Sequence, residues 1–183
     1  MTRVVSRDLT GPATDWRELP MPGANAPLAL TRLDSRPGTF VLHGRFPRGF
    51  TRSVAGGYAV TEEFLVIDGV LEIGDAAYRR GDLTFVPAGF VRGPMRSAHG
   101  CTVLAWFGGP AVFHPAESLP DAVGTGLVSA PIGTALDVPG ASWVRGDDTP
   151  AGATGDAVAA DLSRWWRLAA EAPPPDAHVR VER

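Results

Sequence analysis

Residues 62–96 read EEFLVIDGVLEIGDAAYRRGDLTFVPAGFVRGPMR, and this stretch decides the fold. Its first part holds two apolar runs, 62–67 and 70–74, with the pair Asp68-Gly69 between them. Such a pair between β-branched and apolar runs favours a tight primed turn, so the sequence predicts a β-hairpin centred on 68–69. Two further Gly-Asp pairs mark turns at 74–75 and 81–82.

The rest of the chain supplies more short strands of the same kind. The runs with strand character are 28–33, 39–46, 83–87 and 101–107, with two weaker candidates at 126–130 and 134–138. Turn signals recur about every eight to twelve residues, a pattern typical of barrels and sandwiches and not of βαβ folds. The sequence therefore predicts an all-β fold.

A glutamate, a proline and several glycines stand at fixed spacing in the same stretch. Six residues separate Glu62 from Gly69, five separate Gly81 from Pro87, and Gly89 lies two positions beyond Pro87. This spacing resembles the two motifs of the cupin superfamily, G-x5-H-x-H-x3,4-E-x6-G and G-x5-P-x-G-x2-H-x3-N. The stretch PAGFVRGPMRSAHG is also similar to a bacterial cupin subgroup of unassigned activity. The resemblance implies a double-stranded β-helix (jelly-roll) barrel.

Most metal ligands of these motifs are replaced. Cupins usually hold one divalent metal on three histidines and a glutamate. The three histidine positions read Gly56, Tyr58 and Arg92 here, and the asparagine of the second motif reads Arg96. Glu62 alone is kept, so we expect no metal cofactor. The alternative is a replacement iron or zinc site built from Glu62, His43 and His99, because both metals accept carboxylate and imidazole ligands.

Three of these positions form the candidate catalytic site. The resemblance directs Tyr58, Glu62 and Arg92 into the barrel, where we expect a Glu62–Arg92 ion pair. Glu62 in apolar surroundings suits a general acid or base, and Tyr58 suits a proton donor or relay. Arg92 suits binding of a carboxylate, phosphate or enolate oxygen. The opposing interpretation is a structural salt bridge in a vestigial metal site. A one-residue shift in register would exchange Glu62 for Glu63, which we otherwise expect to be solvated.

Other side chains are predicted to contact a substrate. Besides Arg92 they are Phe64, Trp106, Arg96, His43 and His99. Trp106 and Phe107 face opposite sides of their strand, so only one of the two can line the barrel interior.

The chain is expected to divide into three segments. These are an N-terminal arm (1–26), the cupin barrel (27–140) and a C-terminal extension (141–183). The extension is predicted to contain a short helix over about 156–172, ended by Pro173, with a loose charged tail beyond it. The residues that define one helical face, at spacings of four, three and four, are Val158, Leu162, Trp165 and Ala169.

The resemblance and the residues together favour a metal-independent enzyme acting on a small organic molecule. Glutamate, arginine and tyrosine suit an isomerase, cyclase, dehydratase or lyase, with a role in secondary-metabolite biosynthesis as one setting. A non-catalytic ligand-binding cupin is the second interpretation, and a metal-dependent dioxygenase with unusual ligands is the third.

Composition narrows the partners. The net charge of −3 gives no long-range attraction to nucleic acid or anionic membranes. The absence of a leader-like start and of an apolar run of about 18 residues favours a cytoplasmic protein. Cys101 is the single cysteine, so an internal disulfide is excluded, and it is expected to be a buried small residue. Cupins commonly form dimers, so a homodimer is expected, with the N-terminal arm as a candidate for exchange.

Overall fold

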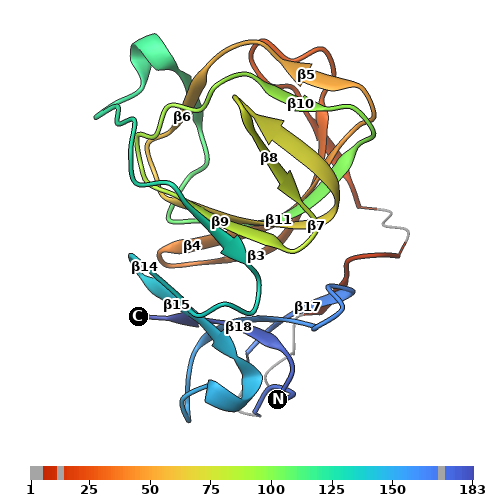
Figure 1. Cartoon of the computed structure of the whole chain (residues 1–183), viewed down its shortest axis with the longest axis vertical. Coiled ribbons are helices and arrows are strands. Elements are labelled where there is room, and N and C mark those ends of the chain that lie inside the picture. The colour runs from red at the N-terminus through yellow and green to blue at the C-terminus, as the bar shows by residue number, and fades with distance from the viewer. Residues whose placement is uncertain (1–5, 12–14, 169–171) are drawn as a thin grey trace. The chain divides into compact units, whose positions relative to one another are not determined.

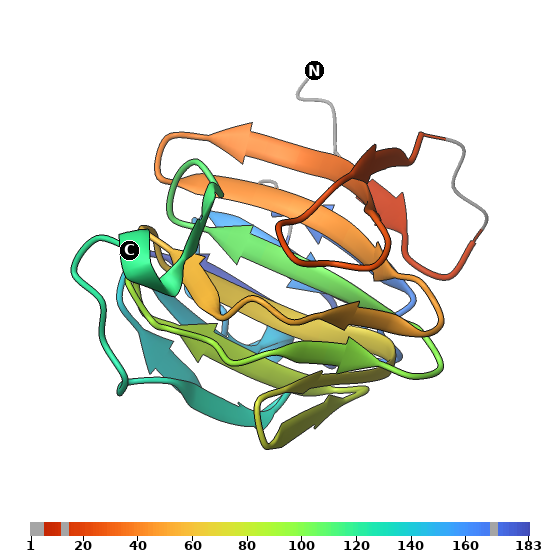
Figure 2. The same cartoon turned by 90° about the horizontal axis from the view of Figure 1, so that it is seen from above.

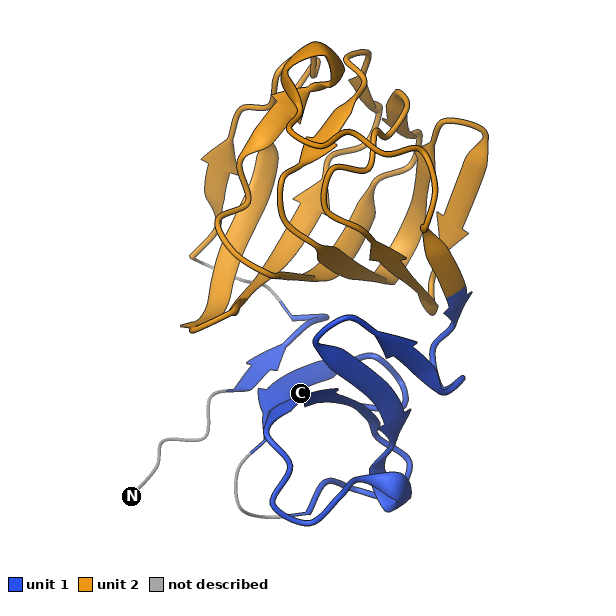
Figure 3. Cartoon of the chain, turned by 90° about the vertical axis from the view of Figure 1, so that its left-hand side faces the viewer, with its two compact units in different colours: residues 1–12, 130–183 blue, residues 13–129 orange. Residues whose placement is uncertain are grey.

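The computed structural model describes residues 6–11, 15–168 and 172–183. These residues form strands joined by turns and two single-turn 3-10 helices, so the all-β prediction is confirmed. The chain divides into two compact units (Figure 3). One comprises residues 13–129 and is called the barrel unit. The other comprises residues 1–12 and 130–183 and is called the terminal unit.

The barrel unit is built from antiparallel strands that curl around a common core (Figures 1 and 2). Its strands are β2 (Arg17–Leu19), β3 (Leu28–Arg36), β4 (Thr39–Phe46), β5 (Phe50–Arg52), β6 (Gly56–Tyr58), β7 (Glu62–Ile73), β8 (Ala76–Arg79), β9 (Asp82–Val86), β10 (Met95–Ser97), β11 (Cys101–Phe107) and β12 (Phe113–Pro115), followed by 3-10 helix η1 (Ala116–Ser118). The main sheet has the order β13-β9-β7-β11-β4-β3-β2, where β13 spans Val128–Pro131. β10 joins β5 to β7, and β8 pairs with β7. The predicted strands at 28–33, 39–46, 83–87 and 101–107 are confirmed.

The predicted hairpin at 68–69 is wrong. β7 runs without interruption from Glu62 to Ile73, pairing with β9 and β11 in its first half and with β8 and β10 in its second. The β7–β11 register shifts beside Asp68, which marks a β-bulge. Gly69 has φ of 77°, and a Cβ there would lie 2.2 Å from the carbonyl oxygen of Gly100. Asp68-Gly69 therefore marks the point where β7 changes its partner strands from β9 and β11 to β8 and β10. The hairpin turn comes at Gly74-Asp75.

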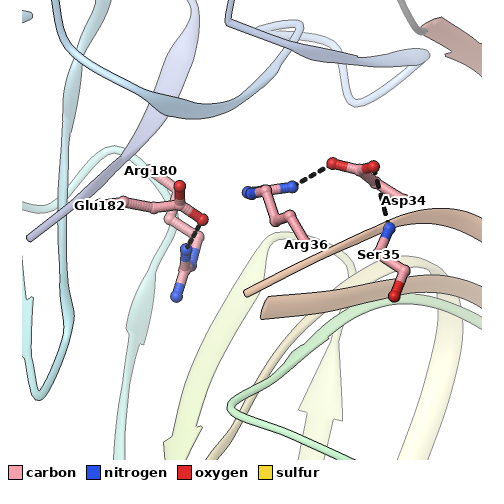
Figure 4. Close-up of polar contacts among 5 residues, drawn as sticks. All are labelled: Asp34, Ser35, Arg36, Arg180 and Glu182. Carbon is pink, nitrogen blue, oxygen red and sulfur yellow. Dashed lines mark hydrogen bonds and ion pairs between the residues drawn. The ribbon is translucent and has the colours of Figure 1, made fainter. Parts of the chain in front are cut away.

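The strands of the barrel unit alternate between two buried faces. On β4 and β11 the side chains of Leu42, Val103 and Phe107 face the interior. His43 and Trp106 point to the opposite side, where both are 1 % exposed. At the β3–β4 end, Arg36 is paired with Asp34 at 2.5 Å (Figure 4).

The terminal unit is a six-stranded antiparallel sheet. Its order is β1-β17-β16-β18-β15-β14. The strands are β1 (Ser6–Asp8), β14 (Leu136–Val138), β15 (Ala141–Arg145), β16 (Gly155–Val158), β17 (Arg164–Arg167) and β18 (His178–Glu182), with 3-10 helix η2 at Gly146–Asp148. Within β18, Arg180 lies 3.4 Å from Glu182 (Figure 4). The predicted loose tail is thus a strand in this sheet.

The predicted helix over 156–172 is wrong. Residues 155–158 and 164–167 form the β16–β17 hairpin, in which Val158 and Trp165 are cross-strand partners. Leu162 sits in the connecting turn with φ of 60°. The hairpin therefore brings together the same apolar residues as a helix would. The spacing of these residues in the sequence cannot distinguish a hairpin from a helix. Ala169, the last residue of the proposed helical face, lies outside the described residues.

The expected N-terminal arm contributes to both units. β1 pairs with β17 in the terminal unit, and β2 pairs with β3 in the barrel unit. The units divide at 129–130, whereas the expected barrel ends at 140. Among the described residues, none belongs to a helix long and apolar enough to span a membrane.

Candidate active site

The barrel unit encloses a cavity of about 320 Å³. Most of its wall is apolar. Six of the apolar lining residues, from β3, β4, β7 and β11, are Leu28, Leu30, Leu42, Phe64, Val103 and Phe107. Leu19 also lines the cavity and is 46 % exposed, so the cavity reaches the surface beside β2. A largely apolar cavity of this size with a few polar groups is typical of small-molecule sites.

The charged and hydroxyl-bearing lining residues are Arg52, Tyr58, Glu62 and Arg92. They come from β5, β6, the first residue of β7 and the segment before β10. Arg92 is fixed by two backbone hydrogen bonds with Gly56, its amide donating at 2.9 Å and its carbonyl accepting at 3.0 Å. This bridge joins the second motif to the start of β6, so Arg92 meets Tyr58 and Glu62 at one end of the cavity.

Glu62 and Arg92 form a buried ion pair, as the sequence suggests. The Arg92 Nη2 group donates to Glu62 Oε2, and the side chains of Arg92 and Glu62 are 5 % and 9 % exposed respectively. The Arg92 guanidinium also stacks over the Tyr58 ring, with its Cζ 4.8 Å from the ring centroid. The guanidinium thus holds the carboxylate in a defined place against the cavity.

Tyr58 carries a hydroxyl that stays protonated well above neutral pH. Burial is the main cause that raises the pKa of Tyr58, and the negative charge of Glu62 adds to it. Its ring packs edge-on against Phe107 at 5.1 Å and Phe113 at 5.9 Å between centroids. The raised pKa keeps this hydroxyl protonated, so it can act as a hydrogen-bond donor.

Arg52 is a site residue that the sequence reasoning missed. Its side chain is 2 % exposed and lines the cavity. Its guanidinium lies over the Phe113 ring, with Cζ 4.2 Å from the centroid. Burial lowers the pKa of Arg52 from its ordinary value to about 10. The segment RGFTRS carries too few apolar residues to be recognised as a strand, so nothing in it indicated that Arg52 points inward.

Four of the predicted substrate contacts do not line the cavity. Trp106 and His43 point to the opposite face, where Trp16 stacks on His43 at 4.9 Å between ring centroids. Arg96 is exposed and pairs with Glu72 on the outside. His99 is exposed in the turn before β11.

Two predictions about orientation are settled by the strand register. Glu62 lines the cavity whereas Glu63 points to the other face, and Glu63 is buried (5 % exposed), so the expectation of a solvated neighbour is wrong. Phe107 is the aromatic residue that lines the interior in place of Trp106. Phe64 lies in the cavity wall as predicted.

The residues at the polar end do not fit a cupin metal. The donor set there is one carboxylate, already paired with Arg92, and the second cation of Arg52 would repel a divalent ion. At Gly56, a histidine position of the motif, a Cβ would lie 2.2 Å from the His114 carbonyl oxygen. Among the described residues, no three His, Cys, Asp or Glu side chains lie close enough together to hold a metal ion. The proposed Glu62–His43–His99 set is not brought together, since His43 and His99 lie outside the cavity.

The chain matches no protein-family model and no curated protein. Solved structures do match. A candidate dioxygenase from Nostoc punctiforme is 14 % identical with a TM-score of 0.63, covering 98 % of this chain and 78 % of that one. An acetylacetone dioxygenase from Acinetobacter johnsonii is 14 % identical with a TM-score of 0.49, covering 65 % and 83 %. A cupin superfamily protein from Desulfitobacterium hafniense is 17 % identical with a TM-score of 0.37, covering 44 % and 75 %.

These likenesses concern the fold. The chain has the cupin-type β-barrel fold, as its motif spacing implies, and the resemblance is confirmed at that level.

Proposed function

We propose that the barrel unit is a metal-independent enzyme that acts on a small organic molecule by acid–base chemistry. The observation that carries this proposal is the Glu62–Arg92 pair beside Tyr58 at one end of an otherwise apolar cavity. A buried ion pair is poor evidence of stability, because desolvation offsets much of the attraction. Its position facing a cavity is better accounted for by chemistry than by packing.

The roles follow from which of the three groups can accept a proton and which can donate a hydrogen bond. Glu62 is held ready to accept a proton from a substrate carbon next to a carbonyl group, with the bonding electrons moving onto the carbonyl oxygen. Arg92 and the Tyr58 hydroxyl supply positive charge and a hydrogen-bond donor for that developing oxyanion. Return of the proton to another carbon gives isomerisation, and loss of a leaving group gives dehydration or lyase cleavage. A cyclase would use the same carbanion as its nucleophile.

Substitution at Glu62 tests the proposal. Glu62→Gln preserves shape and removes the base, so turnover should fall by about 10²-fold or more while ligand affinity changes little. Tyr58→Phe should lower turnover less, since it removes one donor of a set. Arg96→Met, outside the cavity, is the matched control and should behave as the parent protein. Full activity of Glu62→Gln would refute the general-base role.

A non-catalytic ligand-binding protein is the second candidate. It is favoured by the same ion pair, because the Glu62 carboxylate is already held by Arg92 and is therefore less available to a substrate proton. Tight ligand binding without turnover, unchanged by Glu62→Gln, would select this candidate. The dioxygenase interpretation, with iron or zinc, has no support from the donor set at the cavity.

We also propose a homodimer formed along the edge strand β2. Residues Arg17–Leu19 are all exposed, and β2 is the last strand of the main sheet. An uncovered edge is a template for pairing with another strand. Light scattering coupled to size-exclusion chromatography should give twice the chain mass, and Glu18→Pro should give the monomer; a monomeric parent would exclude the proposal.

A further inference from the structure

The cavity contains a buried cation whose hydrogen-bond donors are unused. Arg52 is 2 % exposed, yet its Nε and Nη2 groups have no hydrogen-bond partner among the described residues. The Phe113 ring covers one face of the guanidinium, which leaves its N–H edge for other contacts. Buried donors without partners are costly, so in most proteins a buried arginine is paired. An unpaired one that lines a cavity indicates a partner that enters from outside.

The charges at the polar end do not balance. Glu62 and Arg92 neutralise each other, and Arg52 adds one positive charge. Arg92 Nε is likewise buried without a partner. The lowered pKa of Arg52 agrees with this excess of positive charge, because burial and repulsion from Arg92 both disfavour its charged form. A single negative charge beside Arg52 would restore neutrality at this end of the cavity.

The rest of the cavity wall indicates the polarity and size of the remaining part of the ligand. Leu28, Leu42, Phe64 and Val103 offer only hydrocarbon to the rest of the cavity. The volume of about 320 Å³ equals about ten water molecules at their share of the liquid, so a ligand would have on the order of ten non-hydrogen atoms.

We infer that the cavity binds a small amphipathic monocarboxylate, with its carboxylate on Arg52 and its hydrocarbon part against the leucine and phenylalanine wall. The planar guanidinium edge matches a carboxylate with two parallel hydrogen bonds. A phosphate monoester would bring close to two negative charges against one. This inference rests on the proposed function of the same cavity and names its substrate class. It also moves the role of acid anchor from Arg92, which is occupied by Glu62, to Arg52.

The test measures binding of acids and their neutral counterparts to the full chain by calorimetry. The probes are octanoate and 3-phenylpropanoate, each compared with its own amide, together with octyl phosphate. At least one acid should bind at least about tenfold more tightly than its amide and than the phosphate. Equal binding of acid and amide, preference for the phosphate, or no binding of either acid at millimolar concentration would overturn the inference.

Variants assign the effect to Arg52. Arg52→Met should abolish the preference for acid over amide, whereas Arg96→Met should retain it. If Arg52→Met fails to fold, judged by circular dichroism, Arg52→Lys replaces it and should retain charge but bind the acid more weakly. Persistence of the full preference in whichever Arg52 variant folds would contradict the assignment. Acid binding by the parent protein without turnover of the bound acid would leave this inference standing and remove the proposed enzyme function.

Discussion

At the scale of single residues, the polar end of the cavity holds two arginines and one carboxylate, which is paired with Arg92. Arg92 stands where the motif has a histidine ligand, and it binds the one ligand that is kept, Glu62. Arg52 enters from a segment outside both motifs and leaves an unbalanced charge. The sequence could place Arg92 and Glu62 because the motif fixes their positions. It could not place Arg52, because its burial depends on the closure of the barrel.

Arg52 should reduce the stability of the unliganded protein. Burial lowers the pKa of Arg52 to about 10, below its ordinary value, so the folded state holds this proton less tightly than the unfolded chain. The buried charge therefore opposes folding at neutral pH, and this penalty is relieved only as the pH rises above about 10. Arg52→Met should raise the free energy of unfolding by about 1–2 kcal/mol at neutral pH, measured by urea denaturation. Arg96→Met is the control, and a destabilised Arg52→Met would contradict this account.

Cys101 should be chemically inert in the folded protein. Its side chain is 3 % exposed, and burial raises the pKa of the thiol to about 12. The thiolate is the reactive form, so a disulfide reagent at about pH 8 should label the native protein slowly and the urea-unfolded protein at once. Rapid stoichiometric labelling of the native chain would show that this part of the core opens readily.

His178 should make the terminal unit sensitive to acid. Burial lowers the pKa of His178 from 6.5, with repulsion from Arg145 adding to it. The unfolded chain therefore takes up the proton first, and stability is lost as pH falls through 6.5 toward the folded value. His178→Gln should lose less stability than the parent between about pH 8 and pH 5. His99→Gln, at an exposed position, should follow the parent; equal losses in all three proteins would refute the assignment.

At the scale of elements, strand identity was predictable and strand connection was not. β4 and β11 have the predicted bounds because their apolar runs are flanked by clear turn residues. The Asp68-Gly69 pair has the sequence of a hairpin turn, yet it lies at a β-bulge within β7. Only the pairing of β7 with β11 distinguishes the bulge from a turn. The hairpin of β16 and β17 imitates a helical face for a similar reason, since Val158 and Trp165 meet across strands.

The bulge in β7 should be more sensitive to substitution than the turn that follows it. Gly69 and Gly74 both have positive φ, but only at Gly69 would a methyl group meet backbone, 2.2 Å from the Gly100 oxygen. Gly74→Ala should cost about 1–2 kcal/mol, the penalty of the left-handed conformation alone. Gly69→Ala should cost clearly more, because β7 and β11 must also separate. Denaturant midpoints of the two variants test this, and equal midpoints would contradict the role of Gly69.

At the scale of the whole molecule, the motif spacing identified the barrel fold and the loss of metal ligands. The extent of the terminal unit was beyond the sequence, because β1 and β18 come from opposite ends of the chain and join one sheet. Two of the six predicted substrate contacts, His43 and Trp106, fell outside the cavity for one reason. Period-2 alternation says that neighbours face opposite sides, but both faces of β4 and β11 are buried, so hydrophobicity alone could not choose between Trp106 and Phe107.

The central claim is that guanidinium charge takes the place of a cupin metal. Elemental mass spectrometry of the untagged protein, before and after incubation with iron, zinc, manganese or nickel, tests it most directly. The account predicts less than about a tenth of an equivalent of any metal per chain, because the cavity offers two cations and one carboxylate already paired with Arg92. About one equivalent of a single metal, lost on Glu62→Gln, would contradict it.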